Sequence, residues 1–202
     1  MKSLDKRKEI ISVAMELLAE NGFHGVPMSM IADRANVAVG TIYRYFAGKD
    51  ELINALFQEL EARITAAIRG SFPTTGSFRE RFLYLNGIIL RYLIDNPLHF
   101  RYLEQFMNSP YGVSMRRDRL LEKEGRDDIF MTLFEEAIAA RIVKDIPINA
   151  LFSLAIAPLI FLVRDHILGF VTLNEDLIRQ TAEACWDAVR RNDCESGADR
   201  AR

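Results

Sequence analysis

Apolar residues recur every three to four positions along most of the chain, which is the period of an amphipathic helix. The first such pattern sets Ile10 and Leu18 on one stripe and predicts a helix of about four turns. We expect that helix to stop at Gly22, because glycine suits the left-handed residue just past a helix end. Two short patterns follow, over 27–35 and about 38–46. A tight turn at Asn36-Val37 separates these two predicted helices.

A longer helix is predicted over 49–70, and the segment "GSFPTTGS" then breaks the helical pattern with two glycines and a proline. Ser77 followed by Glu80 has the spacing of a capping box, which starts another helix. Further start signals give about nine helices and no alternating strand segments. The predicted fold class is therefore all-α, with an N-terminal domain over 1–50, a linking helix, and a C-terminal domain over 71–202.

One stretch of 18 residues, 146–163, carries no charge. That length could span a membrane, but Pro158 lies inside it and a long polar stretch precedes it, so no membrane span is expected. A helix that is apolar on all sides must be covered on all sides. We therefore predict a homodimer through the helices at about 148–168 and 174–191. The second helix offers an apolar stripe of Leu177, Ile178, Thr181, Cys185, Trp186 and Val189.

The short helix at about 38–46 has two faces of different character. Ile42 and Phe46 are four residues apart, so they point the same way, and packing them on the preceding helix gives a helix-turn-helix. The opposite side carries Gly40, Thr41 and Arg44, with Tyr43 and Tyr45 on the flanks. A glycine permits close approach, a threonine can bond a base or phosphate, and an arginine can donate two hydrogen bonds to guanine. Tyrosine hydroxyls can reach phosphates, and so can Lys49 at the start of the next helix.

Overall charge limits how such a surface could work. The chain has 202 residues, half of them apolar, and a net charge of −2, so it has no general attraction to polyanions and any nucleic-acid site must be local. Cys185 and Cys194 lack metal-ligand spacing, and no early apolar run resembles a signal peptide. These features favour a reduced, cytoplasmic compartment.

The ordered segment "IADRANVAVGTIYRYFAGKDEL" resembles the DNA-binding domain of the TetR (tetracycline-repressor) family of bacterial transcription regulators, over roughly residues 8 to 53. The resemblance implies roles for eight residues. By position, Val39, Gly40, Thr41 and Arg44 face bases, and Ser29, Tyr43, Tyr45 and Lys49 face phosphates. It also implies a homodimer on a double-stranded, pseudo-palindromic operator, with two recognition helices about 34 Å apart. Three places depart from the pattern. Asn36 tolerates a left-handed turn, whereas Ala38 loses a helix cap. Val26-Pro27 stands where a threonine or serine often caps the second helix, which removes one phosphate contact.

The C-terminal two-thirds is rich in rings and thioethers, most of which belong to a core. The resemblance implies that this part binds a small-molecule effector and forms the dimer, and a mostly apolar pocket with few polar anchors suits a hydrophobic or aromatic ligand. Candidate effector contacts are Tyr102, Phe106, Tyr111, Phe130, Phe134 and His166. For each of them, a place in the core remains the alternative.

The expected function is a transcriptional repressor that a bound effector releases from DNA. An enzyme is not expected, because no histidine has a partner at metal spacing, no phosphate loop follows a strand, and no nucleophile has a recognisable setting. No catalytic residue, metal site or cofactor is therefore assigned. The alternative is a helical adaptor that binds another protein without sequence-specific DNA binding.

Overall fold

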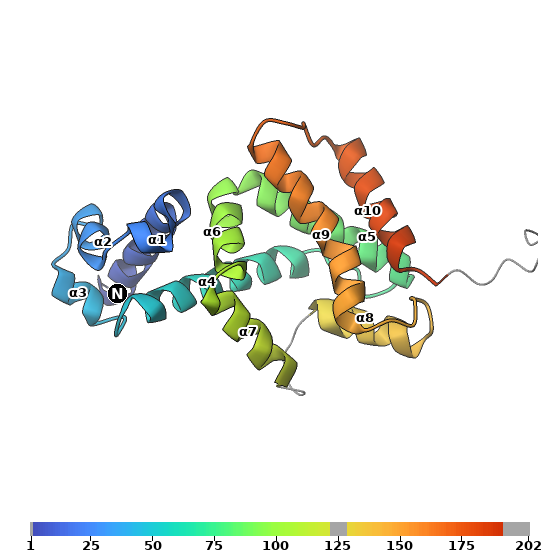
Figure 1. Cartoon of the computed structure of the whole chain (residues 1–202), viewed down its shortest axis with the longest axis horizontal. Helices are drawn as coiled ribbons and strands as arrows, with labels where there is room; N and C mark the ends of the chain where they lie inside the picture. Colours follow the sequence, from blue (N-terminus) through green and yellow to red (C-terminus); the bar gives the residue numbers. More distant parts are fainter. Residues whose placement is uncertain (1, 122–128, 192–202) are drawn as a thin grey trace, which may run out of the picture. The chain divides into compact units, whose positions relative to one another are not determined.

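The computed structural model describes residues 2–121 and 129–191. Within these ranges the fold is all-α, as predicted, apart from one isolated bridge between Val143 and Arg190. The helices are α1 Lys2–Gly25, α2 Met28–Arg34, α3 Val39–Tyr43, α4 Lys49–Arg69, α5 Phe78–Asp95, α6 Pro97–Met107, α7 Pro110–Leu121, α8 Ile129–Ala139, α9 Ile148–Ile167 and α10 Glu175–Val189 (Figure 1). The sequence signals did not indicate the start of α8.

The chain packs as two compact units, each built from two segments. The first unit comprises Met1–Ala66 and Asp95–Gly125, and the second comprises Ala67–Ile94 and Arg126–Arg202. Packing therefore groups α6 and α7 with the N-terminal helices. The domain division predicted near residue 70 is not tested by this grouping and stays a prediction.

Three local predictions for the N-terminal helices can be compared with the structure. Gly22 has a left-handed φ of 77°, but the helical segment resumes after this kink and ends at Gly25. Asn36 has a φ of 50°, as expected for the turn before α3. Ala38 provides no side-chain cap, and α3 covers only Val39–Tyr43, which is shorter than the pattern predicted. An uncapped helix of five residues depends on packing for its stability.

In the first unit, α1 contacts α2 and α6 (Figure 1). The amide of Gln105 on α6 donates to the backbone carbonyl of Ala19 on α1, at 3.0 Å. Phe106 on α6 stacks on Phe57 of α4, with the ring centroids 4.0 Å apart. These contacts attach α6 to both α1 and α4, far apart in sequence.

The second unit begins with the predicted capping box. The backbone N–H of Ser77 donates to Glu80 Oε2 at 2.7 Å, and the N–H of Glu80 donates to Ser77 Oγ at 3.2 Å. Aromatic rings from α5, α8 and α10 then form a shared core, in which Phe78, Phe82, Phe134 and Trp186 lie with centroids about 6 Å apart. This core fixes α5 against the C-terminal helices.

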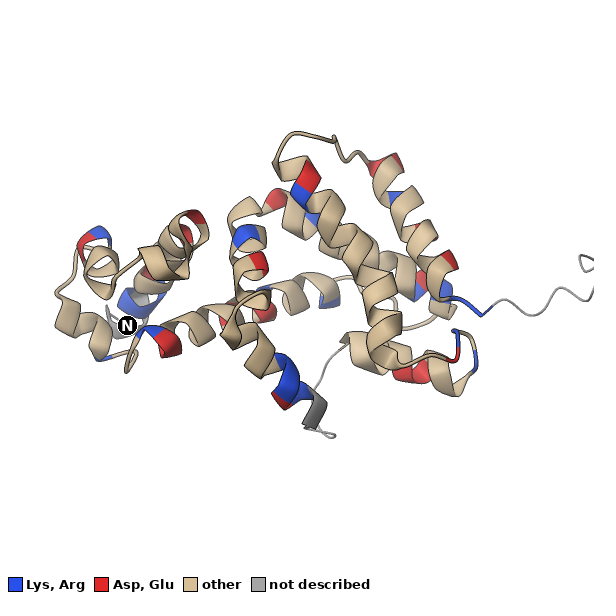
Figure 2. Cartoon of the chain, viewed as in Figure 1, with Lys and Arg blue, Asp and Glu red and all other residues tan. Residues whose placement is uncertain are grey.

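Helix α9 is apolar on faces that its own chain does not cover. Phe152 is 39% exposed and Phe161 is 60% exposed, and Figure 2 shows no charged residue along most of the helix. Only 22% of its most apolar stretch of 18 residues is buried. By length and composition alone α9 could cross a membrane, but a single such helix is weak support for a span. The exposed apolar side chains need cover of some kind.

Candidate nucleic-acid interface

The inner face of α3 is fully packed. Ile42 is 0% exposed and Phe46 is 2% exposed, and the backbone N–H of Phe46 donates to the carbonyl of Ile42 at 3.0 Å. The guanidinium of Arg7 on α1 lies over the Phe46 ring, 5.4 Å from its centroid. The predicted inward direction of these two apolar residues is therefore confirmed, and it fixes which side of α3 faces solvent.

The outer face carries the polar residues that the sequence placed there. Tyr43 is 52% exposed, Arg44 and Gly40 are exposed, and Thr41 is half-buried. A Cβ added at Gly40 would meet no heavy atom within 4 Å, so another molecule can approach the backbone closely there. This surface offers an arginine fork, hydroxyls and an open backbone, which are the groups that a DNA groove reader needs.

The other four predicted DNA contacts differ in how exposed they are. Val39 and Tyr45 are half-buried, and Ser29 is exposed on α2. Lys49 is half-buried, and its ammonium donates a hydrogen bond to the backbone carbonyl of Val26, in the connection before α2. The structure brings all eight residues into the first unit, but it gives Lys49 an intramolecular partner.

Two acidic residues beside Lys49 have partners that the sequence did not indicate. Asp50 Oδ1 accepts a hydrogen bond from the hydroxyl of Tyr111 on α7, at 2.6 Å. Glu51 Oε2 accepts one from the backbone N–H of Ala47, in the turn after α3. Carboxylates in the first turn of a helix are favoured by the positive end of its dipole, but no local signal identifies a partner 61 residues away.

Three of the six predicted effector contacts lie inside the first unit. Tyr102 is fully buried, and its hydroxyl donates to the backbone carbonyl of Ile53 on α4. Burial raises the pKa of Tyr102 far above its ordinary value, so the phenol stays neutral. Phe106 stacks on Phe57, and Tyr111 bonds to Asp50. All three therefore connect α6 and α7 to the N-terminal helices.

The remaining three lie in the second unit, each in different surroundings. Phe134 is 1% exposed in the aromatic core. Phe130 packs edge-on against Phe152, with centroids 5.8 Å apart. His166 Nδ1 lies 3.3 Å from the backbone nitrogen of Leu173, in the connection to α10. Their role in effector binding stays a prediction.

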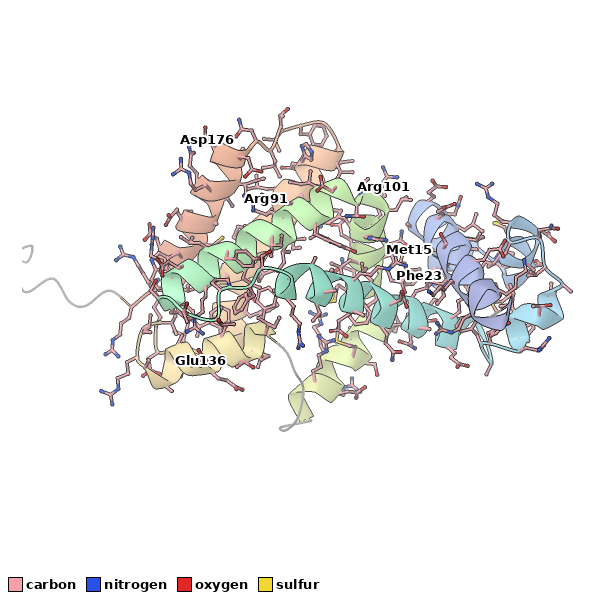
Figure 3. All side chains as sticks on the ribbon, turned by 180° about the vertical axis from the view of Figure 1, so that it is seen from behind. Met15, Phe23, Arg91, Arg101, Glu136 and Asp176 are labelled. Carbon is pink, nitrogen blue, oxygen red and sulfur yellow. The ribbon has the colours of Figure 1, made fainter. Side chains whose placement is uncertain are left out.

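Two hollows among the described residues have linings that include none of the predicted effector contacts. An open groove of about 430 Å³ runs between α5 and α10, and its lining includes Arg91 and Asp176, which Figure 3 labels. The side chains of Arg91 and Glu175 form an ion pair beside it. A smaller cavity of about 150 Å³ lies between α1, α4 and α6, beside Met15 and His99. Burial lowers the pKa of His99, and the nearby positive charge of Arg63 adds to this effect. No cluster of three potential metal ligands occurs in the part of the chain that the structure describes.

The fold and the exposed face of α3 define the class of the protein: a helix-turn-helix regulator that binds DNA. Residues 10–56 match the family described as bacterial regulatory proteins, tetR family, and residues 77–190 match the tetracyclin repressor-like C-terminal domain. The chain belongs to the TetR family of transcriptional regulators.

Individual relatives agree with this assignment. An uncharacterized HTH-type transcriptional regulator of Haemophilus influenzae is 27% identical over 187 residues, which cover 93% of this chain and 97% of the relative. A TetR family regulator of Marinobacter aquaeolei superposes with a TM-score of 0.80 at 22% identity, covering 95% and 100% of the two chains. The regulator FadR of Bacillus subtilis, solved in complex with stearoyl-CoA, superposes with a TM-score of 0.70 at 20% identity, covering 91% and 97%. At such identities the two solved structures show the fold alone.

Proposed function

We propose that this regulator is a repressor that binds a pseudo-palindromic operator as a homodimer and is released by a hydrophobic or aromatic effector. The observation that carries the DNA-binding part is the two-sided structure of α3: Ile42 and Phe46 are buried, while Tyr43 and Arg44 face solvent. A two-fold dimer would present two such helices about one turn of DNA apart, roughly 34 Å.

Within each half of the operator, the chemistry of each side chain determines whether it would contact a base or a phosphate. Arg44 would donate its fork to a guanine, and Thr41 would bond a neighbouring base edge, with the open backbone at Gly40 allowing the approach. Tyr43 would donate its hydroxyl to a phosphate at the flank of the groove. Val39, Ser29, Tyr45 and Lys49 complete the proposed contact surface.

The homodimer would use α9 and α10, and the structure supports the two helices unequally. Phe152 and Phe161 of α9 are exposed and apolar, as expected of a surface that a second copy covers. The predicted apolar stripe of α10 instead faces its own chain: Ile178 is 3% exposed and Cys185 is 2% exposed. We therefore assign the apolar part of the interface to α9, and α10 would add its more polar outer face.

The effector proposal rests on similarity. The C-terminal match is to a tetracyclin repressor-like domain, and the related FadR was solved with a long-chain acyl-CoA. A ligand that fits one arrangement of the dimer better than another weakens DNA binding by the ratio of its two affinities. Typical couplings of about 1–3 kcal/mol correspond to roughly 5- to 150-fold. The protein would act in the cytoplasm, on DNA, and without catalysis.

The decisive experiment is selection of bound duplexes from the organism's genomic DNA, followed by binding measurements on the recovered sequence. Arg44→Ala should lose preference for one base pair per half-site, at a cost of about 1–3 kcal/mol. Arg101→Ala is the matched control, because Arg101 is exposed on α6 rather than on α3 (Figure 3). An adaptor that binds only proteins would select no duplex. If Arg44→Ala and Arg101→Ala bound the recovered sequence and its variants alike, the exposed face of α3 would not be the surface that contacts the bases.

A further inference from the structure

Three consecutive side chains at the start of α4 each bond to a different element of the first unit. Lys49 donates to the carbonyl of Val26, before α2. Asp50 accepts from Tyr111 of α7, and Glu51 accepts from the N–H of Ala47, in the turn between α3 and α4. The first turn of α4 therefore links the connections on both sides of the helix-turn-helix to α7.

The half-buried Tyr111 contacts two other aromatic rings. Its ring lies edge-on to Phe23 of α1, with centroids 6.0 Å apart, and roughly parallel to Phe106 of α6, at 6.4 Å; Figure 3 labels Phe23. The next residue, Gly112, packs so closely on α6 that an added Cβ would lie 2.3 Å from the carbonyl oxygen of Phe106. This close contact fixes the start of α7, where Tyr111 lies, against the end of α6.

The bond itself joins a neutral donor to a charged acceptor. A carboxylate accepts a shorter and stronger hydrogen bond than a neutral oxygen does, which agrees with the 2.6 Å separation of Tyr111 and Asp50. The same bond raises the pKa of Tyr111 above its ordinary value, because it stabilises the protonated hydroxyl.

We propose that Tyr111 is a positioning residue for operator recognition: its hydrogen bond to Asp50 fixes the start of α4, and the adjoining Glu51–Ala47 bond passes that constraint to α3. Tyr111 touches no DNA in this scheme. The proposal rests on DNA binding through α3 but not on any particular effector. In the chain, α7 is the last helix of the first unit before residue 126, where the second unit resumes. Arg119 of α7 also pairs with Glu61 of α4, but the Tyr111–Asp50 bond is the one that reaches the first turn of α4, next to the connection from α3.

Hydrogen exchange in the free protein tests the constraint without an operator. Tyr111→Phe removes one oxygen and keeps the ring, so the unit should stay folded. We expect faster amide exchange at Ala47 and in α3, with unchanged exchange in α5. Tyr84→Phe is the matched control, because its hydroxyl bonds to the carbonyl of Ile68 in the second unit. Unchanged exchange at Ala47 in the Tyr111 variant would overturn the proposal, whether or not the protein proves to bind the proposed operator.

DNA binding separates a positioning role from a purely structural one. On the selected operator duplex, Tyr111→Phe should weaken binding about tenfold, which corresponds to the lower limit for a hydrogen bond to a charged group. Binding to an unrelated duplex at the same salt should change less than about twofold, because its phosphate contacts need no fixed orientation. Equal weakening on both duplexes would overturn the proposal.

Variants of the acceptor complete the test. Asp50→Asn keeps an oxygen that can accept the Tyr111 hydroxyl, so it should retain most operator affinity. Asp50→Leu removes the acceptor and should match Tyr111→Phe. The double variant Tyr111→Phe with Asp50→Leu should be no weaker than either single variant, since both remove the same bond. Additive losses in the double variant would show that the two residues act separately and would overturn the proposal.

Discussion

The ammonium of Lys49 donates a hydrogen bond to the backbone carbonyl of Val26, 23 residues earlier in the chain. This bond holds the start of α4 against the connection between α1 and α2. A lysine can donate up to three hydrogen bonds, so the contact to Val26 leaves capacity for a phosphate. Lys49 therefore has a structural role in addition to its proposed DNA contact.

We predict that Lys49→Ala affects both stability and DNA binding. Loss of the bond to Val26 should lower the free energy of unfolding by about 1 kcal/mol, which corresponds to a melting temperature roughly 2–4 °C lower. Binding to all duplexes should weaken, and the salt dependence should flatten by up to about one unit. Calorimetry and binding at several salt concentrations measure these effects. Arg44→Ala provides the comparison, because Arg44 is exposed and should leave the melting temperature unchanged.

A second prediction contrasts two glycines of the first unit. A Cβ at Gly112 would lie 2.3 Å from the Phe106 carbonyl oxygen and 2.7 Å from Met107 Cα, whereas a Cβ at Gly40 would meet nothing within 4 Å. Gly112→Ala must push α7 away from α6, so it should destabilise the protein by about 3 kcal/mol or more. Gly40→Ala should keep or raise stability by up to about 1 kcal/mol, because alanine favours a helix.

For DNA binding, the informative variant is Gly40→Ala, the one that should remain stable. The methyl group of Gly40→Ala would occupy the surface proposed to approach the groove, so operator affinity should fall while urea unfolding shows a fully stable protein. If Gly40→Ala bound its operator as tightly as the original chain, close approach at this position would be disproved. A Gly112→Ala variant with unchanged stability would likewise contradict the packing of α7 on α6.

A third prediction concerns pH. Burial raises the pKa of the Cys185 thiol to about 11, from an ordinary value of 9.0. Between these values the folded protein keeps a proton that the unfolded chain releases, so stability should fall as pH rises from 9 through 11. The slope from this group is at most roughly 1.4 kcal/mol per pH unit. Urea unfolding of the original chain and of Cys185→Ala should show a steeper alkaline decline in the original chain. Parallel curves would mean that the thiol titrates alike in both states.

Local signals in the sequence predicted local structure well. The positive φ of Asn36 and the reciprocal bonds of Ser77 and Glu80 follow from interactions among residues within three or four positions. The inward direction of Ile42 and Phe46 follows from helical spacing alone. In each case the information needed lies within one or two turns of helix.

Long-range partners could not be predicted in the same way. The pattern around Tyr102 and Phe106 shows that rings will be buried, but a core and a ligand pocket demand the same residue types. Only the folded chain shows that Tyr102 bonds to a carbonyl 49 residues away and that Gln105 bonds to one 86 residues away. The apolar stripe of α10 has the same ambiguity, because an amphipathic pattern does not distinguish burial within one chain from burial against a copy.

The last prediction tests the proposed dimer surface on α9. Phe161 is 60% exposed on this helix, and Phe170, which follows α9, is 78% exposed. In a two-fold interface each substitution occurs twice, so Phe161→Glu would place two carboxylates in an apolar contact and should give a monomer at micromolar concentration. Phe170→Glu makes the same chemical change outside the proposed interface and should leave the dimer intact. Sedimentation velocity distinguishes these states. A dimeric Phe161→Glu variant would exclude this face, and an original chain that is monomeric would exclude the homodimer itself.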